Sequence, residues 1–200
     1  MRCVAVVVAL LVSATNVAAQ EQTLFKGGEM GGFGGPVVKF TTVNDRGVVM
    51  VGGRGGWIIG HSLMLGGGGY GVVTEVDAPE QVLPGNGPLD IQFGYGGFEL
   101  EYIVHPNSLG HFSVGTLIGG GDTHFVRDVG PVTKSTQTVG ESDGVFVMEP
   151  AVNAELNVTP WFRLNAGASY RWVSGIDQAG LKNGDFSGMT GTLILKFGKF

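Results

Sequence analysis

In several segments of this 200-residue chain, charged and other polar residues alternate with apolar ones. The clearest case is residues 161–172, where Arg163 and Arg171 share one parity and Phe162, Tyr170 and Trp172 share the other. Successive side chains of a β-strand point to opposite faces, so this period of two predicts a strand with one charged and one apolar face. Polar faces of the same kind carry the candidate charge network Arg54, Glu99, Glu101, Glu149, Glu155, Arg163 and Arg171, with Lys39 as a further candidate.

The chemistry open to these charges depends on whether a closed sheet brings them together. Inside a narrow barrel they would face one another, and each buried charge needs a partner to replace its lost hydration. We expect a structural set of ion pairs that fills the interior. A proton or ion path is the alternative, whereas a substrate pore does not fit an interior that side chains fill.

Two other patterns suggest a metal site and a dinucleotide-binding loop, but the residues around each pattern do not complete the site. His105 and His111 flank one predicted turn, but no cysteine or nearby carboxylate completes a metal site, so we expect solvated turn histidines. Gly66, Gly68 and Gly71 match the spacing of a dinucleotide-binding loop. The segment after them is strand-like, and without a helix N-terminus a phosphate lacks its binding site. We therefore expect no metal and no cofactor.

The elements that must position these residues are strands separated by turn-forming segments. Short connections at 60–61, 105–110 and 159–160 alternate with long ones at 77–88, 127–143 and 175–185, and residues 44–47 form a further short turn with Gly47 available for positive φ. This alternation predicts a closed eight-stranded antiparallel up-and-down transmembrane β-barrel. The expected strands are 32–43, 48–59, 62–76, 89–104, 111–125, 145–158, 161–172 and 186–200.

Two strands depart from simple alternation. In residues 89–104 the apolar parity changes at Gly96 and Gly97, which we interpret as a β-bulge. The facing of residues 62–76 stays ambiguous.

The apolar faces predict contact with lipid. The segment 161–172 is long enough for a tilted strand to cross a bilayer with its apolar face toward lipid. We assign a lipid-facing aromatic girdle to Phe162, Tyr170, Trp172 and Trp57. After the leader, no run of 18 apolar residues exists for a helical span.

The N-terminus predicts export. Residues 1–19 combine Arg2, an apolar core at 4–12 and small residues before Gln20, which is typical of a signal peptide. We expect residues 20–26 to be a short lead and 27–200 the barrel. Cys3 lies in the leader, so the mature chain has no disulfide. A net charge of -5 with scattered acids disfavours nucleic acid as a partner, and the 37 glycines allow the bends of a small barrel.

Over about residues 27–200 the chain resembles the small eight-stranded outer-membrane proteins of Gram-negative bacteria. The segments GGFGGP, VGGRGGWIIGHS and GGGGYG are also similar to an uncharacterised group of small exported barrels. The resemblance implies a monomer in the outer membrane, with membrane lipid and the barrel-assembly machinery as partners and a structural or interaction role through its outer loops.

The terminal aromatic departs from the pattern of these proteins. Phe200 shares parity with Lys196 and Gly198 rather than with Leu195 and Phe197. Either a bulge near Gly198 restores the register, or the assembly signal is weak.

Two alternatives remain open. Some barrels of this kind modify lipid A with a histidine, a serine and a carboxylate, and His124, Ser135 and Glu141 offer those groups in and beside the longest loop. An ordinary polar loop explains the same residues, so no catalytic residue is assigned. The second alternative is a soluble exported β-barrel that acts as a binding module.

Overall fold

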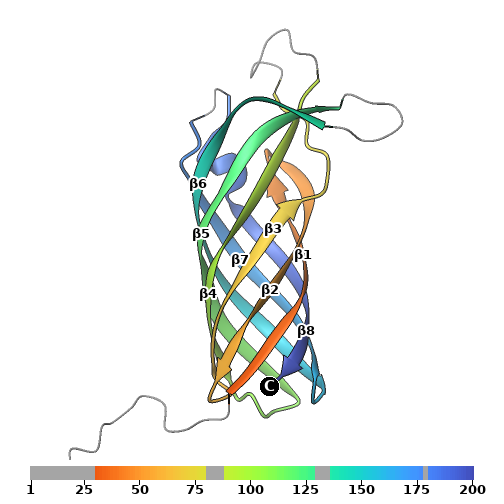
Figure 1. Cartoon of the computed structure of the whole chain (residues 1–200), viewed down its shortest axis with the longest axis vertical. Coiled ribbons are helices and arrows are strands. Elements are labelled where there is room, and N and C mark those ends of the chain that lie inside the picture. The colour runs from red at the N-terminus through yellow and green to blue at the C-terminus, as the bar shows by residue number, and fades with distance from the viewer. Residues whose placement is uncertain (1–29, 80–87, 129–135, 178–179) are drawn as a thin grey trace, which may run out of the picture.

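The computed structural model describes residues 30–79, 88–128, 136–177 and 180–200. These residues form eight antiparallel strands, each paired with its neighbours in sequence, and β8 pairs with β1 to close the barrel (Figure 1). The elements are β1 (Met30–Val43), β2 (Arg46–Ile59), β3 (Leu63–Val72), β4 (Asp90–Val104), β5 (Gly110–Asp128), β6 (Thr136–Thr159), β7 (Phe162–Ser174), α1 (Asn183–Phe186) and β8 (Gly188–Lys199). The predicted closed barrel is confirmed. The predicted leader and lead lie outside the described residues.

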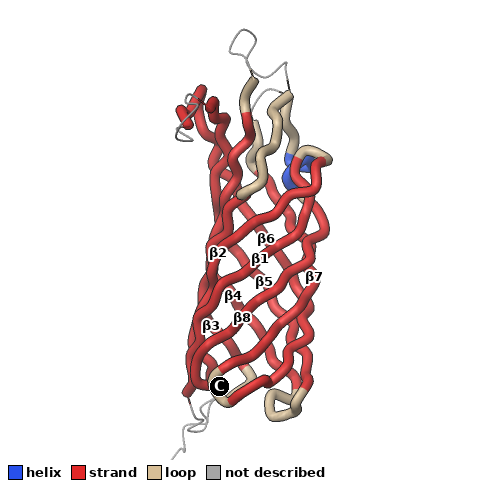
Figure 2. Tube along the Cα trace, turned by 90° about the vertical axis from the view of Figure 1, so that its right-hand side faces the viewer, coloured by secondary structure: helices blue, strands red, loops and turns tan. Residues whose placement is uncertain are grey.

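The two ends of the barrel differ in their connections. Short turns join β2 to β3, β4 to β5 and β6 to β7 at the end where the chain terminates (Figure 2). We call this the turn end, and the opposite end, which carries α1 and the longer connections, the loop end. Within the described residues no helix is long and apolar enough to cross a membrane.

The first connection at the loop end is a tight two-residue turn. Asn44 and Asp45 have φ of 49° and 59°, as a type I′ hairpin turn requires. The assignment of positive φ to Gly47 was wrong, because Gly47 already pairs with Thr42 in the ladder. Asparagine and aspartate tolerate this conformation because their short side chains form local hydrogen bonds.

Strands β5 and β6 extend beyond the other strands and bend over the loop end (Figure 1). The predicted loop at 127–143 was therefore wrong for its described part: β5 continues to Asp128 and β6 begins at Thr136. The ladder shifts register between Thr123 and Phe125, which bends the pair. Phe125 is buried in the apolar cluster at this end and the partly buried Val139 packs against it, although the segment around Val139 is polar.

Strand β4 has no bulge at Gly96 and Gly97, contrary to our interpretation. Its register with β3 and with β5 runs unbroken through both glycines. Tyr95 points inward and is buried, whereas Phe98 points outward and is 55% exposed. The strand stays regular, and the parity of its apolar residues changes because the interior changes along the barrel axis. Toward the loop end the interior is apolar and the apolar residues of β4 point inward, whereas nearer the turn end the interior is charged and they point outward.

The interior has three levels, the middle one charged. At the turn end Phe33, Ile58, Met64 and Ile103 form a small apolar cluster. At the loop end a larger apolar cluster includes Phe93 and, from α1, Phe186. The buried charged side chains fill the barrel between these clusters. Strand β3, whose facing was ambiguous, points Met64 and Tyr70 inward.

Phe200 closes the turn end from within. Its ring stacks on Phe33 with centroids 6.3 Å apart, and the guanidinium of Arg163 lies 4.0 Å from its ring centroid. Of the two alternatives for this strand end, a bulge near Gly198 is absent, since Gly198 pairs with Phe33 in a continuous register. The inward parity of Phe200 is therefore a packing feature of this barrel.

Glycines on the two faces of the wall have different roles. A Cβ added at the inward Gly119 would overlap the backbone of Gly96 and Gly97, so the strands meet more closely there than other residues allow. A Cβ added at the outward Gly71 meets nothing within 4 Å. The interior glycine is thus required by packing, and the outward one is not.

We predict that Gly119→Ala destabilises the barrel by about 1–3 kcal/mol through overpacking, while the matched Gly71→Ala changes stability by less than about 0.5 kcal/mol. Urea unfolding of the purified proteins in detergent measures both. Equal unfolding midpoints for the two variants would contradict this account of the wall.

Candidate functional site

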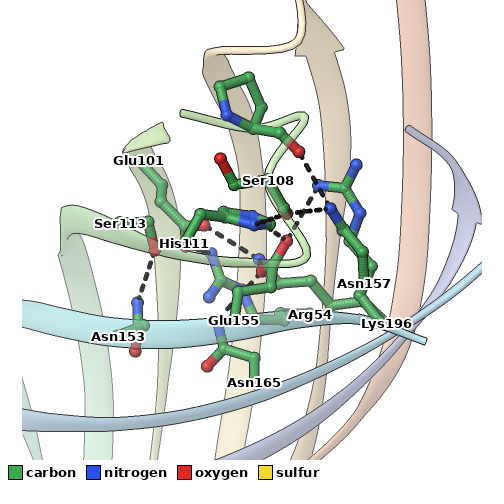
Figure 3. A network of polar contacts seen from close by, with 12 residues as sticks. Arg54, Glu101, Ser108, His111, Ser113, Asn153, Glu155, Asn157, Asn165 and Lys196 are labelled. Atoms are coloured by element: carbon green, nitrogen blue, oxygen red, sulfur yellow. Dashed lines mark hydrogen bonds and ion pairs between the residues drawn. The ribbon is translucent and has the colours of Figure 1, made fainter. Parts of the chain in front are cut away.

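The carboxylate of Glu155 is the centre of the charged network near the turn end. Its Oε1 accepts from Arg163 at 3.0 Å and lies 3.1 Å from His111 Nε2. Its Oε2 accepts from Lys196 Nζ at 2.5 Å and from Asn165 Nδ2 at 3.2 Å. Figure 3 shows these side chains converging from four strands, β5, β6, β7 and β8.

Lys196 extends this network across the interior to β4. Its ammonium bridges Glu155 and Glu101, the latter at 2.9 Å. Glu101 also pairs with Arg54 of β2 at 2.8 Å. Arg54 Nε lies 2.6 Å from Glu99 Oε2 as an ion pair without hydrogen-bond geometry. The hydroxyl of Tyr70 on β3 donates to the other oxygen of Glu99 at 2.6 Å, so one connected network links seven of the eight strands.

A second network lies nearer the loop end and includes the remaining strand, β1. Lys39 Nζ pairs with Glu149 Oε2 at 2.8 Å and donates to the Tyr95 hydroxyl at 2.9 Å. Tyr95 and Ser169 both donate to Glu149, each at 2.5 Å. The ammonium also lies 3.6 Å from the centroid of the Tyr70 ring, so aromatic faces and oxygen atoms together replace its hydration.

Arg171 differs from the other predicted members of the network. Within the described residues it forms no ion pair with Glu149 or Glu155, the acidic members of the network on the neighbouring strand β6. It instead donates to the backbone oxygen atoms of Phe186 at 2.7 Å and Thr42 at 2.9 Å, and to the sulfur of Met50 at 3.2 Å. Arg171 therefore ties α1 and the end of β1 to the wall at the loop end.

Several members of the two networks were not predicted, among them Lys196, Tyr70, Asn165 and Ser169, and His111 was misplaced. Lys196 was noted only for its parity with Phe200, and Tyr70 was left on a strand of unassigned facing. His111 was expected to be solvated, which is wrong: it is 4% exposed, and its ring lies between Glu155 and the Ser108 carbonyl oxygen. The available signal was its parity, because His111 alternates in step with Ser113 on the polar list.

The interior leaves little free space. A cavity of about 40 Å³ lies among Lys39, Arg54, Glu99, Glu101 and Glu149. A water molecule needs about 10–15 Å³ on this measure, so the cavity holds at most a few. The apolar clusters lie beyond the charges on either side, and the arrangement suits a plug of ion pairs rather than a channel.

The other candidates stand apart from this network. His105 is exposed in its turn with φ of 53°, and Gly66, Gly68 and Gly71 lie within β3. In the described ranges no group of three or more histidine, cysteine or acidic side chains could hold a metal ion.

The residues of the enzyme alternative are not seen as a set. His124 Nδ1 lies 3.0 Å from the carboxylate of Asp122 on the same strand. Glu141 is exposed on β6, and Ser135 lies outside the described residues.

The predicted girdle residues lie on the outer wall. Trp57 is 67% exposed, Trp172 55% and Tyr170 48%. Phe162 is half-buried, because its ring stacks on Phe197 with centroids 5.0 Å apart.

We predict that Glu155→Gln costs about 3–5 kcal/mol in unfolding free energy, because Arg163 then stays buried without its carboxylate partner and Lys196 keeps only Glu101. Asp45→Asn, at the exposed first turn, is the matched control and should change stability little. Urea unfolding in detergent provides the measurement. Adding Lys196→Met to Glu155→Gln should recover part of the loss, and a double variant weaker than the single one would refute the pairing.

Comparisons with known proteins give a likeness of fold. No protein-family model matches the chain, and no curated protein matches it. Among solved structures, Neisserial surface protein A is similar with a TM-score of 0.51 and 16% identity, over 86% of this chain and 97% of that one.

Two further solved structures are more distant. The attachment invasion locus protein Ail of Yersinia pestis has a TM-score of 0.43 and 15% identity over 86% of this chain and 97% of its own. The outer membrane protein OprG of Pseudomonas aeruginosa has a TM-score of 0.41 and 12% identity, over 87% of this chain and 96% of its own. The similarity to Neisserial surface protein A shows that the chain shares the fold of a small closed β-barrel.

Proposed function

We propose that this protein is an outer-membrane β-barrel with a closed interior, which presents its loop end outside the membrane as a structural or interaction surface. The observation that carries the proposal is the reversal of polarity in the wall: large apolar side chains point outward around an interior of paired charges. A soluble β-barrel would place these two sets the other way round, because apolar surface is buried away from water.

The outward apolar residues have the extent of a bilayer. On β7 they run from Phe162 to Trp172 through Leu164, Ala166 and Tyr170. This is about ten residues, which at about 3.3 Å per residue and a tilt of about 40° span about 25 Å, the height of the apolar band of membrane barrels. An aromatic residue stands at each end of the list, as interfacial girdles require.

The loop end has the reverse polarity. On β4 and β5 the outward positions toward this end are Gln92, Asp122 and His124, while Ile91 and Phe93 are buried inside. This is the pattern of a water-soluble barrel, so we place this part beyond the lipid. Its exposed surface, with the β5–β6 extension, is the part of the protein that a partner outside the cell can reach.

The closed interior supports a role without transport. The ion pairs span the interior, the cavity among these charges holds only a few water molecules, and apolar clusters lie at both ends. The likeness in fold to a protein named as a Neisserial surface protein agrees with such a role.

We predict that Ala166→Arg, on the outward face in the middle of the β7 list, costs about 2–4 kcal/mol and reduces membrane assembly. Gln92→Arg, outward but beyond the proposed lipid band, should assemble like the parent. Outer-membrane yield after a urea wash and the heat-dependent shift on gels measure both. Normal yield of Ala166→Arg would contradict the facing, and a soluble periplasmic parent protein would refute the membrane proposal itself.

We also predict that the purified protein shows no ion conductance in planar bilayers, because an ion would have to separate Lys196 from Glu101 and Glu155 inside a narrow lumen. Inserted protein is verified by its heat-dependent gel shift, and a porin tested in parallel confirms that the bilayers detect channels. Reproducible current steps would show that the interior opens.

A further inference from the structure

The outer wall carries a groove near the turn end that the proposed role does not use. It has a volume of about 670 Å³ and crosses the outward face of β8, β1, β2 and β3. Its floor contains Gly32, Gly34, Gly55 and Gly67, and the side chains beside it are Trp57 and Phe197.

Strand packing does not account for glycine throughout this floor. A Cβ added at Gly34 would meet nothing within 4 Å, and one added at Gly32 would meet only the Gly56 carbonyl oxygen, at 3.4 Å. Glycine within a strand lowers stability because it loses more conformational entropy and packs no side chain. Glycine at these two positions keeps the groove deep, because larger side chains would fill it.

A cation lies at the turn-end side of this groove. Lys199 is the β8 residue directly across from Gly32, and it is exposed on the outward face. Cross-strand neighbours on one face lie about 5 Å apart at their Cβ positions, so a lysine side chain can reach over the end of the floor. Trp57 pairs with Gly32 on the other side of β1 and is 67% exposed.

We propose that this groove binds one acyl chain of an anionic glycerophospholipid, whose phosphate pairs with Lys199. The site rests on the proposed membrane location, since the groove then faces hydrocarbon and Lys199 lies at the headgroup level of the periplasmic side. The hydrocarbon chain packs on the glycine floor between Trp57 and Phe197. Lys199 selects for negative charge, because a lysine near a membrane surface favours an anionic lipid by a factor of about five.

The test uses the full chain in lipid vesicles, in a variant whose only tryptophan is Trp57. The chain has three tryptophans, so Trp161→Phe and Trp172→Phe leave Trp57 to report on lipid at the groove. Brominated phosphatidylglycerol or brominated phosphatidylcholine, at equal mole fraction in unbrominated phosphatidylcholine, quenches the fluorescence when it occupies the site. We expect an apparent association about fivefold stronger for the anionic lipid.

Two substitutions separate the headgroup from the acyl chain, each with a matched control. Lys199→Gln should remove the preference for phosphatidylglycerol, whereas Lys182→Gln, exposed at the loop end, should keep it. Gly34→Leu should fill the groove and lower quenching by both lipids. Gly71→Leu, outward with equally open space but outside the groove, should leave quenching unchanged.

Three results would overturn the site. Equal quenching by both lipids in the parent, unaffected by Lys199→Gln and Gly34→Leu, would show ordinary lipid contact. A dimer in detergent that Gly34→Leu converts to a monomer would assign the groove to a second copy of this chain. If urea extracts the parent protein from the vesicles, the protein does not insert, and the proposed membrane location is wrong along with the site. A protein that inserts but shows no lipid preference would refute the site alone.

Discussion

The structure depends on the requirement that each charge inside the closed wall find a partner within it. Glu155 meets this requirement with donors from three other strands, and Lys196 carries the connection on to Glu101 and, through Arg54, to Glu99. Arg163 is only 8 residues from Glu155, whereas Lys196 and Glu101 are 95 residues apart and lie on opposite sides of the interior. The connection across the interior therefore forms only when strands distant in sequence are brought together in the closed ring. An uncompensated charge would cost several kcal/mol, which penalises open or misregistered arrangements of the same strands.

This requirement also explains why the interior has levels. In the middle of the barrel charges gather inside an apolar outer wall, and toward the loop end aliphatic and aromatic side chains fill the interior of a polar wall. At the turn end a small apolar cluster lies inside a wall that is also apolar. Arg171 lies where the charged level meets the apolar cluster of the loop end. Its guanidinium donates hydrogen bonds to backbone oxygen atoms of β1 and of Phe186, at the end of α1. The same residue that belongs to the charged face of β7 therefore holds the apolar cluster at the loop end in place. A closed turn end, a charged middle and a capped loop end leave the outer surfaces as the parts available for contact.

Alternation could predict which residues face inward but not which of them meet. Arg163 and Arg171 were placed in one network with all the acidic residues of the polar faces, because parity assigns a face and no partner. The register places Arg163 beside Glu155, whereas Lys39 from β1 reaches Glu149 across the interior. His111 was misplaced because a turn was expected to hold it in water, although its parity put it inside. The change at Gly96 was taken for a bulge because one strand viewed alone does not show that the interior itself changes from polar to apolar.

The eight strands, the alternation of short and long connections and the facing of most side chains could be predicted from the sequence. These follow from local rules, since a period of two and turn-forming residues act over a few neighbouring positions. The partners of each buried charge, the extension of β5 and β6, the capping role of Arg171 and the groove beside Trp57 could not be predicted in this way. Those features depend on how strands distant in sequence are staggered around a closed ring, and the stagger is set by the whole ring rather than by any single strand.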